Sequence, residues 1–238
     1  MENWFGSIIN DRFTLFSTSH TLMIILYFIV LMVLFFHYKK ITASSHFSNV
    51  LRWTLAGFLL LSETTYQIWM AVNDIWRLEY SMPLHICSLA GMLAIIALTT
   101  RNKHIIIFTY FLGFLPAGLT IITPELAFDY PHYRYWQFFL HHIVLSCSSF
   151  YLVLTSRVNI TLKTALTAFG VLLFYALVVG AFINPVLGGN YLFLSASPAN
   201  DTIINFLGSG IFYIVNLVIV GFFVFLLSFG VFKLAARR

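Results

Sequence analysis

The chain has 238 residues, of which 60% are hydrophobic and only 9% are charged. A soluble domain carries roughly 25% charged residues, so this composition excludes an ordinary soluble domain, and it is too apolar for a disordered chain. The net charge of +5 does not call for a nucleic-acid partner, because membrane proteins accumulate basic residues on their cytoplasmic side.

Seven apolar segments predict seven transmembrane helices. A helix needs roughly 20 apolar residues to cross the hydrocarbon layer, and its backbone groups must pair within the segment. The segments cover residues 18–38, 50–72, 82–99, 104–123, 135–155, 163–184 and 207–232. Little sequence lies between them, so residues 1–238 are predicted to form a single all-α membrane domain.

The connections between the segments alternate in charge, and this predicts an orientation. Alternate connections and the C-terminal tail hold most of the basic residues, namely Lys39, Lys40, Arg52, Arg101, Lys103, Arg157, Lys163, Lys233, Arg237 and Arg238. The other connections and the N-terminus hold Arg12, Arg77 and Arg134 and nearly all the acids, namely Glu2, Asp11, Asp74, Glu79, Glu125, Asp129 and Asp201. The positive-inside rule then predicts an N-terminus outside and a C-terminus in the cytoplasm.

Three local features are expected along the chain. Pro116 should kink the fourth segment, because it lacks an N–H group and its ring crowds the preceding turn. Small residues at Cys87, Ala90, Gly91 and Ala94 form a ridge that lets another helix approach closely. In the last outer connection, residues 191–194 (Tyr-Leu-Phe-Leu) are expected to rest on the membrane surface.

The predicted orientation places the unusual polar residues at similar depths, in the outer half of the bilayer. They include the following candidates for a shared site: His20, Glu63, Gln67, His85, Cys87, His141 and His142. The first, second, third and fifth segments could therefore frame a polar cavity that opens to the outside or to the outer leaflet.

Glu63 is the one acid inside a predicted segment. A charged group at the centre of a membrane helix costs about 2.5–3.5 kcal/mol, so Glu63 must face the bundle interior and find a partner. It could act as a general base, carry a proton or orient a histidine. It could equally be a protonated acid with a purely structural hydrogen bond. Gln67, one turn away, extends the same polar face.

Cys87 has two interpretations. It could be a nucleophile whose base comes from another helix, because His85 diverges from it by about 200° around the helix. The matching depth then nominates His141 or His142, which point about 100° apart. Alternatively, Cys87 is only a small apolar residue in the ridge. It is too far from Cys147 in depth for a disulfide, so both thiols are expected to be free.

No cofactor or metal is expected. The histidines show no HxxxH or HExxH spacing, and the chain has no phosphate-binding loop, no dinucleotide fingerprint and no GxSxG motif. The oligomeric state does not follow from the sequence.

Four stretches resemble the bacterial YwaF-type integral membrane proteins: PLHICSL (83–89), the basic connection at 101–103, FFLHH (138–142) and NYLFL (190–194). This family is similar to eukaryotic transmembrane acyltransferases that remodel ether phospholipids with a cysteine and a histidine, and it shares features with small membrane hydrolases of lipid esters. The resemblance implies a multi-pass protein of the bacterial plasma membrane whose partners are membrane lipids.

The resemblance also implies residue roles. Cys87 becomes the candidate nucleophile and His141 or His142 the candidate base. Apart from the resemblance, the hypothesis of a lipid-modifying enzyme gives Glu63 and His85 the role of orienting or polarising the reacting groups. The candidates for binding a lipid or another amphiphile are Gln67, His85, Asn190 and Tyr191. The chain departs from the family pattern at Ser197–Pro198, at Asn205 and at 208–211, where the family has a Lys-Pro pair, an Asp and a Gly-Pro-Trp-Pro turn.

Two other functions fit the same polar cavity. A proton-coupled transporter or binding protein for a small solute or amphiphile would use Glu63 as its proton carrier. A seven-helix sensor or assembly factor would need an output partner, since the cytoplasmic connections are short.

Overall fold

The computed structural model describes residues 2–9, 11–199 and 202–235, so the charges predicted at Asp201, Arg237 and Arg238 lie outside the described residues. Within these ranges the protein is helical and contains no β-strand. A single isolated antiparallel bridge joins Arg12 to Phe128. The predicted all-α class is therefore confirmed for the described part of the chain.

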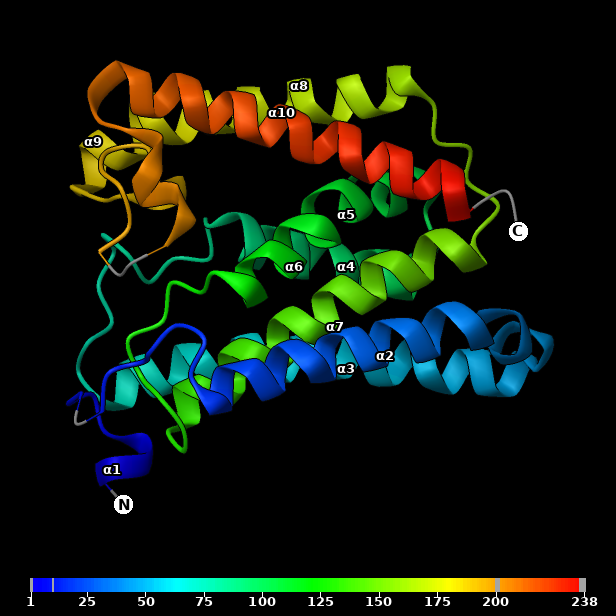
Figure 1. The fold of residues 1–238 in the computed structure, drawn as a ribbon, viewed down its shortest axis with the longest axis horizontal. Coiled ribbons are helices and arrows are strands. Elements are labelled where there is room, and N and C mark those ends of the chain that lie inside the picture. Colours follow the sequence, from blue (N-terminus) through cyan, green and yellow to red (C-terminus); the bar gives the residue numbers. More distant parts are fainter. Residues whose placement is uncertain (1, 10, 200–201, 236–238) are drawn as a thin grey trace.

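Each of the seven predicted segments is helical (Figure 1). After the short α1 (Glu2–Phe5), they correspond in chain order to α2 (Thr18–Ala43), α3 (Ser45–Val72), α4 (Ile86–Thr100), α5 and α6 (Lys103–Gly113 and Leu115–Ile122), α7 (Tyr133–Thr155), α8 with the π-helix η1 and α9 (Leu162–Val178, Val179–Ile183 and Asn184–Leu187), and α10 (Gly210–Ala235). The outer connection before α10 contains two short 3-10 helices, η2 (Tyr191–Phe193) and η3 (Ile203–Leu207).

Five of these helical stretches are long and apolar enough to cross a membrane. They are Thr18–Ala43, Lys103–Ile122, Tyr133–Thr155, Leu162–Leu187 and Gly210–Ala235. The apolar α4 has only 15 residues, and α3 is not among the five although it is 28 residues long, since its sequence carries Arg52, Glu63 and several polar side chains. The protein is thus a multi-pass membrane protein, while the count of seven spans and the orientation stay predictions.

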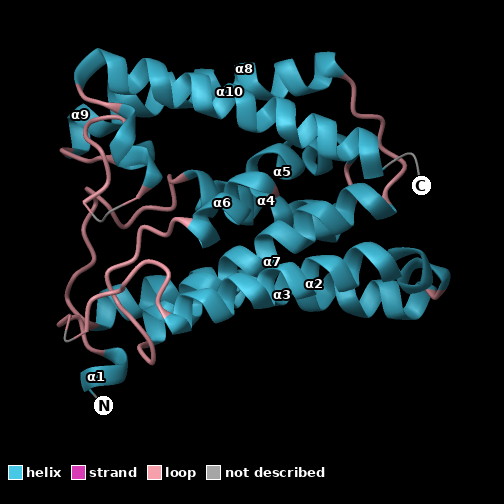
Figure 2. Ribbon diagram, in the orientation of Figure 1, coloured by secondary structure: helices cyan, strands magenta, loops and turns pink. Residues whose placement is uncertain are grey.

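The helices form three groups around α7. Figures 1 and 2 show α2 and α3 side by side along one face and α8 beside α10 along the opposite face, with α4, α5 and α6 between them. The most apolar stretch of α7 is 78% buried inside the protein. The corresponding stretches are only 17% buried in Leu162–Leu187, which begins with α8, and 11% buried in α10. A helix that is apolar on all sides and yet exposed is suited to contact with lipid, so α7 forms the core and the α8–α10 pair the periphery.

The expected kink in the fourth segment is present. The α5 helix ends at Gly113 and α6 begins at Leu115, with Phe114 at φ −74° and ψ −79° between them. Pro116 follows in the first turn of α6, where a missing N–H costs nothing. The break lets α6 present Thr120 to the first turn of α4, as described below.

The connection between α9 and α10 differs from the expectation. Tyr191 does not rest on a membrane surface but is fully buried. Its hydroxyl donates to the Leu78 carbonyl at 2.5 Å and accepts from the Met82 N–H at 3.0 Å, and Asn184 holds its main chain on both sides. A phenol has a polar tip that needs partners, and the loop before α4 supplies them, so Tyr191 turns inward.

Candidate functional site

His141 lies buried on α7 and joins this helix to two others. Its Nδ1 is 3.1 Å from the Ser62 hydroxyl of α3. The other side of the ring faces α4, where a Cβ added to Gly91 would lie 3.4 Å from both Cε1 and Nε2. The ring also contacts the main-chain carbonyl of Cys87. The small-residue ridge of α4 is therefore real, and its gap at Gly91 is filled by an imidazole.

The hydrogen bonds around this ring favour one arrangement of protons. Gln137 Nε2 donates to the Ser62 hydroxyl at 3.1 Å, which leaves the Ser62 proton free to be donated to Nδ1 of His141. The ring proton of His141 then lies on Nε2. The Ser62 oxygen can also accept from Nδ1, so a shift of the ring proton from Nε2 to Nδ1 leaves this contact intact.

Cys87 lies beside this histidine without a direct bond to it. Its sulfur is half-buried in the first turn of α4, and its nearest polar partner is the Thr120 hydroxyl of α6 at 3.9 Å. Within the described residues no imidazole nitrogen makes a hydrogen bond with the thiol. Both cysteines are free, as expected. The structure thus places the His141 ring against Gly91, one helical turn after Cys87 on α4, but it does not show an assembled thiol–imidazole pair.

His142 points elsewhere. Its Nδ1 donates to the Phe138 carbonyl of its own helix at 2.7 Å, and its ring packs on Phe138 with centroids 4.3 Å apart. The sequence left open which of the two adjacent histidines faces α3 and α4. In the structure it is His141.

Glu63 and Gln67 form a second polar group on α3. Gln67 Nε2 donates to Glu63 Oε1 at 3.1 Å and to the Ser81 carbonyl at 3.0 Å, while its Oε1 accepts from the Trp76 indole at 2.9 Å. In the described part of the chain neither side chain bonds to a histidine. Glu63 is half-buried, and these contacts tie it to the loop before α4.

The remaining predicted site residues lie around that loop. His85 is the residue before α4 and has aromatic neighbours on two sides, with ring centroids 5.3 Å from Tyr191 and 5.2 Å from Phe193. Asn190 accepts from the N–H groups of Ser195 and Ala196, both at 3.0 Å. Asn190 and Tyr191 therefore hold the connection in place, and their predicted part in binding a substrate is not tested by these contacts.

Three residues that are connected to His141 by hydrogen bonds were not among the candidates from the sequence: Ser62, Gln137 and Arg134. Arg134 Nη1 donates to Gln137 Oε1 on the next turn of α7, and Gln137 donates to Ser62 as described above. A continuous chain of hydrogen bonds thus runs from Arg134 through Gln137 and Ser62 to His141. The signal was present in the spacing, because residues 134, 137 and 141 follow one face of a helix.

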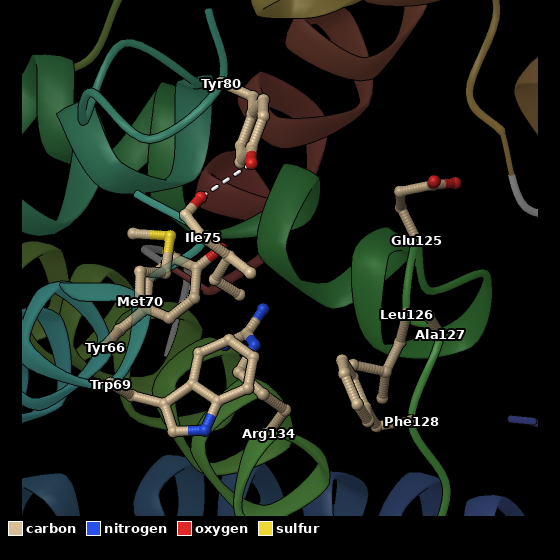
Figure 3. Close-up of a pocket in the computed structure, with 10 residues that line it drawn as sticks. All are labelled: Tyr66, Trp69, Met70, Ile75, Tyr80, Glu125, Leu126, Ala127, Phe128 and Arg134. Atoms are coloured by element: carbon tan, nitrogen blue, oxygen red, sulfur yellow. Dashed lines mark hydrogen bonds between the residues drawn. The ribbon is translucent and has the colours of Figure 1, made fainter. Parts of the chain in front are cut away.

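A pocket of about 220 Å³ lies at the Arg134 end of this series of hydrogen bonds (Figure 3). The C-terminal end of α3, the loop after it, the segment before α7 and α7 itself form its walls. The residues that line it are Tyr66, Trp69, Met70, Ile75, Tyr80, Glu125, Leu126, Ala127, Phe128 and Arg134. Figure 3 shows the Arg134 side chain among the rings of Tyr66 and Trp69.

His20 is structural rather than part of this site. Its Nδ1 accepts from the Phe16 N–H at 2.9 Å, so Nε2 carries the proton and donates to the Ile121 carbonyl at 2.8 Å. Among the described residues, no group of three or more His, Cys, Asp or Glu side chains could hold a metal ion.

Comparison with known proteins places the chain in a family. A sequence model of the TMEM164 family matches residues 15–229, which include every helix from α2 to α9 and every candidate site residue. No curated protein and no solved structure matches the chain. Because the match covers far more than half of the sequence, this membrane protein belongs to the TMEM164 family.

Proposed function

We propose that the protein is a thiol-dependent lipid acyltransferase or lipid-ester hydrolase with Cys87 as nucleophile and His141 as base. The observation that carries the proposal is the position of His141, whose buried ring lies against Gly91 of α4, one helical turn after Cys87, and is held there by Ser62. A histidine beside a cysteine can take the thiol proton and so generate the reactive thiolate.

The reaction would proceed in two halves. In the tautomer that carries its proton on Nδ1, where the Ser62 oxygen accepts the hydrogen bond, Nε2 of His141 is free and takes the proton of the Cys87 thiol. The thiolate attacks the acyl carbonyl carbon, a C–S bond forms, and the ester C–O bond breaks as the leaving oxygen takes the proton from Nε2. A second lipid hydroxyl or a water then gives its proton to Nε2 and attacks the thioester, which releases the product and the thiol.

Acyl transfer by the purified protein in lipid nanodiscs tests this proposal. A lipid ester with a labelled acyl chain is the donor, and both a lysolipid acceptor and water are offered. Cys87→Ala should abolish turnover and the labelled acyl-enzyme, whereas Cys147→Ala, a free thiol elsewhere in the core, should keep both. Equal turnover by the wild type and Cys87→Ala would refute the role of Cys87.

The environment of Glu63 favours a second candidate function, a proton-coupled transporter in the plasma membrane. Glu63 is half-buried on a long helix and accepts from the Gln67 amide, and acids within membrane helices often mark proton or substrate pathways. Uptake driven by a pH gradient that survives Cys87→Ala and fails in Glu63→Gln would favour transport. Uptake that depends neither on pH nor on Glu63 would eliminate it.

A further inference from the structure

A second pocket is an apolar groove between α2 and α10, with a volume of about 370 Å³. Residues between 31 and 36 of α2 line one side, residues between 231 and 235 of α10 line the other, and Phe114 and Phe150 lie between them. Every described side chain that lines the groove is apolar. Because α2, α7 and α10 are long and apolar enough to cross a membrane, the groove belongs to the part of the protein that lies in the hydrocarbon layer.

The groove has a buried bottom and exposed rims. The rings of Phe114 and Phe150 are buried and stack with their centroids 4.7 Å apart. On the rims, Met32, Phe36 and Leu234 are 56%, 62% and 67% exposed. In a membrane such side chains meet lipid tails, and the volume falls within the range of roughly 300–1,000 Å³ that is usual for small-molecule sites. The groove therefore suits one acyl chain of a membrane lipid.

The groove points toward basic residues near the ends of both helices. Lys40 follows Phe36 of the groove by one helical turn, so it continues the same face of α2. On α10, Lys233 directly precedes Leu234 of the groove. Both lysines are exposed, so each ammonium group is accessible to a lipid head group.

The surrounding segments carry charge of one sign. Residues 39–53, 155–163 and 229–235 lie at the same end of the bundle in Figure 1 and contain no Asp or Glu. Their charged residues are Lys39, Lys40, Arg52, Arg157, Lys163 and Lys233. Clusters of this kind attract anionic lipids, and basic pockets between membrane helices bind anionic head groups. An apolar chain that carries an anionic head group is thus complementary to the groove and to its basic end.

We propose that the groove binds an anionic phospholipid, with one acyl chain between α2 and α10 and the phosphate beside Lys40 and Lys233. The lysines supply the selectivity, because the apolar groove alone would accept the chain of any lipid. The proposal does not depend on the acyl transfer described above, since neither Cys87 nor His141 lines the groove.

Photo-crosslinking in a bilayer tests the site. The full chain is placed in phosphatidylcholine nanodiscs with a small fraction of phosphatidylglycerol that carries a diazirine on one acyl chain, and crosslinked residues are mapped by mass spectrometry. Phosphatidylcholine with the same labelled chain forms the second arm. We expect crosslinks within residues 31–36 and 231–235, with about tenfold or more labelling by phosphatidylglycerol, since two nearby lysines favour its anionic head group.

One pair of variants tests the place of the acyl chain. Val231→Trp fills the groove and should remove most of the crosslinking by both lipids. Val215→Trp, at an exposed position of the same helix outside the groove, should label like the wild type. Circular dichroism and melting curves of each variant show whether it is folded.

A second pair tests the head group. Lys40→Gln combined with Lys233→Gln should reduce labelling by phosphatidylglycerol to the level of phosphatidylcholine. Arg12→Gln combined with Arg77→Gln removes two exposed cations from the opposite end of the bundle and should keep the preference for phosphatidylglycerol.

Three results would overturn the proposal. Equal labelling of the groove by the two lipids, or an unchanged preference in the folded double lysine variant, would show that the head group is not selected. Labelling that persists in folded Val231→Trp would place the acyl chain elsewhere. A groove that neither lipid labels, in a protein that light scattering shows to be a dimer, would be covered by a second copy of the chain.

Discussion

Gly91 is where α4 comes closest to the candidate base. A Cβ there would lie 3.4 Å from the His141 ring, an ordinary contact for an alanine, but the methyl groups of a valine would enter the space of the ring. Gly91→Ala should therefore keep acyl transfer and stability. Gly91→Val should displace the imidazole, abolish transfer and cost about 1–3 kcal/mol through overpacking.

The matched control is Gly57→Val on α3, because a Cβ at Gly57 meets nothing within 4 Å. Thermal unfolding in detergent and acyl transfer are measured for all three variants. If Gly91→Val turned over substrate as fast as Gly57→Val, the ring of His141 would not need its observed position.

Ser62 is the second residue that sets the state of His141. Ser62→Ala removes the partner of both Nδ1 and the Gln137 amide, so kcat should fall about tenfold or more, part of the 10²–10⁴ that a positioned base contributes. KM should change little. Ser62→Thr restores the hydroxyl and should recover most of the rate, and Thr64→Ala, at an exposed position on the same helix, serves as the control. A fall in KM alone, or no rescue by threonine, would contradict a role in orienting the base.

At the scale of elements, the N-terminal segment is bound to the C-terminal end of α3 and to the start of α7. The Phe5 carbonyl accepts from the Trp69 indole at 2.7 Å and from Asn73 at 3.1 Å, and the Gly6 carbonyl accepts from His132 Nε2 at 3.0 Å. His132 Nδ1 accepts in turn from the Arg134 N–H at 3.1 Å. Only the neutral imidazole can make both bonds.

This arrangement predicts that the N-terminal segment loosens in acid. Burial is the main cause that lowers the pKa of His132, and the charge of Arg134 acts in the same direction, while the bond to Gly6 opposes them. The unfolded chain therefore takes up the proton first as the pH falls. The contribution of His132 to stability is complete above its ordinary pKa of about 6.5 and is lost below it.

Hydrogen exchange of residues 4–9 checks this prediction, with rates at pH 5 and pH 8 corrected for intrinsic chemical exchange. We expect several-fold faster opening at pH 5. His132→Gln can still donate to Gly6 but does not titrate, so it should lose most of the pH dependence, and His37→Gln, on an exposed part of α2, should retain it. A pH dependence that persists in His132→Gln would assign it to another group.

At the scale of the whole molecule, the alternation of charges predicts which end of the bundle faces outward. In a background with Cys87→Ala and Cys147→Ala, Glu79→Cys should react with a membrane-impermeant maleimide in intact cells, and Arg157→Cys should react only after the membrane is opened. Both positions are exposed in the structure. The opposite pattern would invert the bundle, and labelling of both from one side would contradict an odd number of spans between them.

Much of the architecture could be predicted because it follows from local physics. Apolar segments of a given length must be helices in lipid, Pro116 must interrupt a helix, and Ala90, Gly91 and Ala94 must permit a close approach. Each of these features depends on neighbouring residues alone. The family resemblance nominated Cys87 and the histidine pair in the same way, from short contiguous motifs.

The sequence by itself determined the helical class, the helical segments, the kink and the small-residue ridge, because periodicity and backbone chemistry act over a few residues. Only the tertiary structure decided that His141 rather than His142 faces α4, that Tyr191 turns inward, and that Ser62, Gln137 and Arg134 connect the pocket to the imidazole. These contacts join residues as far as 113 positions apart, and their existence depends on how the helices rotate against each other. No local pattern specifies that rotation, which is set by the packing of the whole bundle around α7.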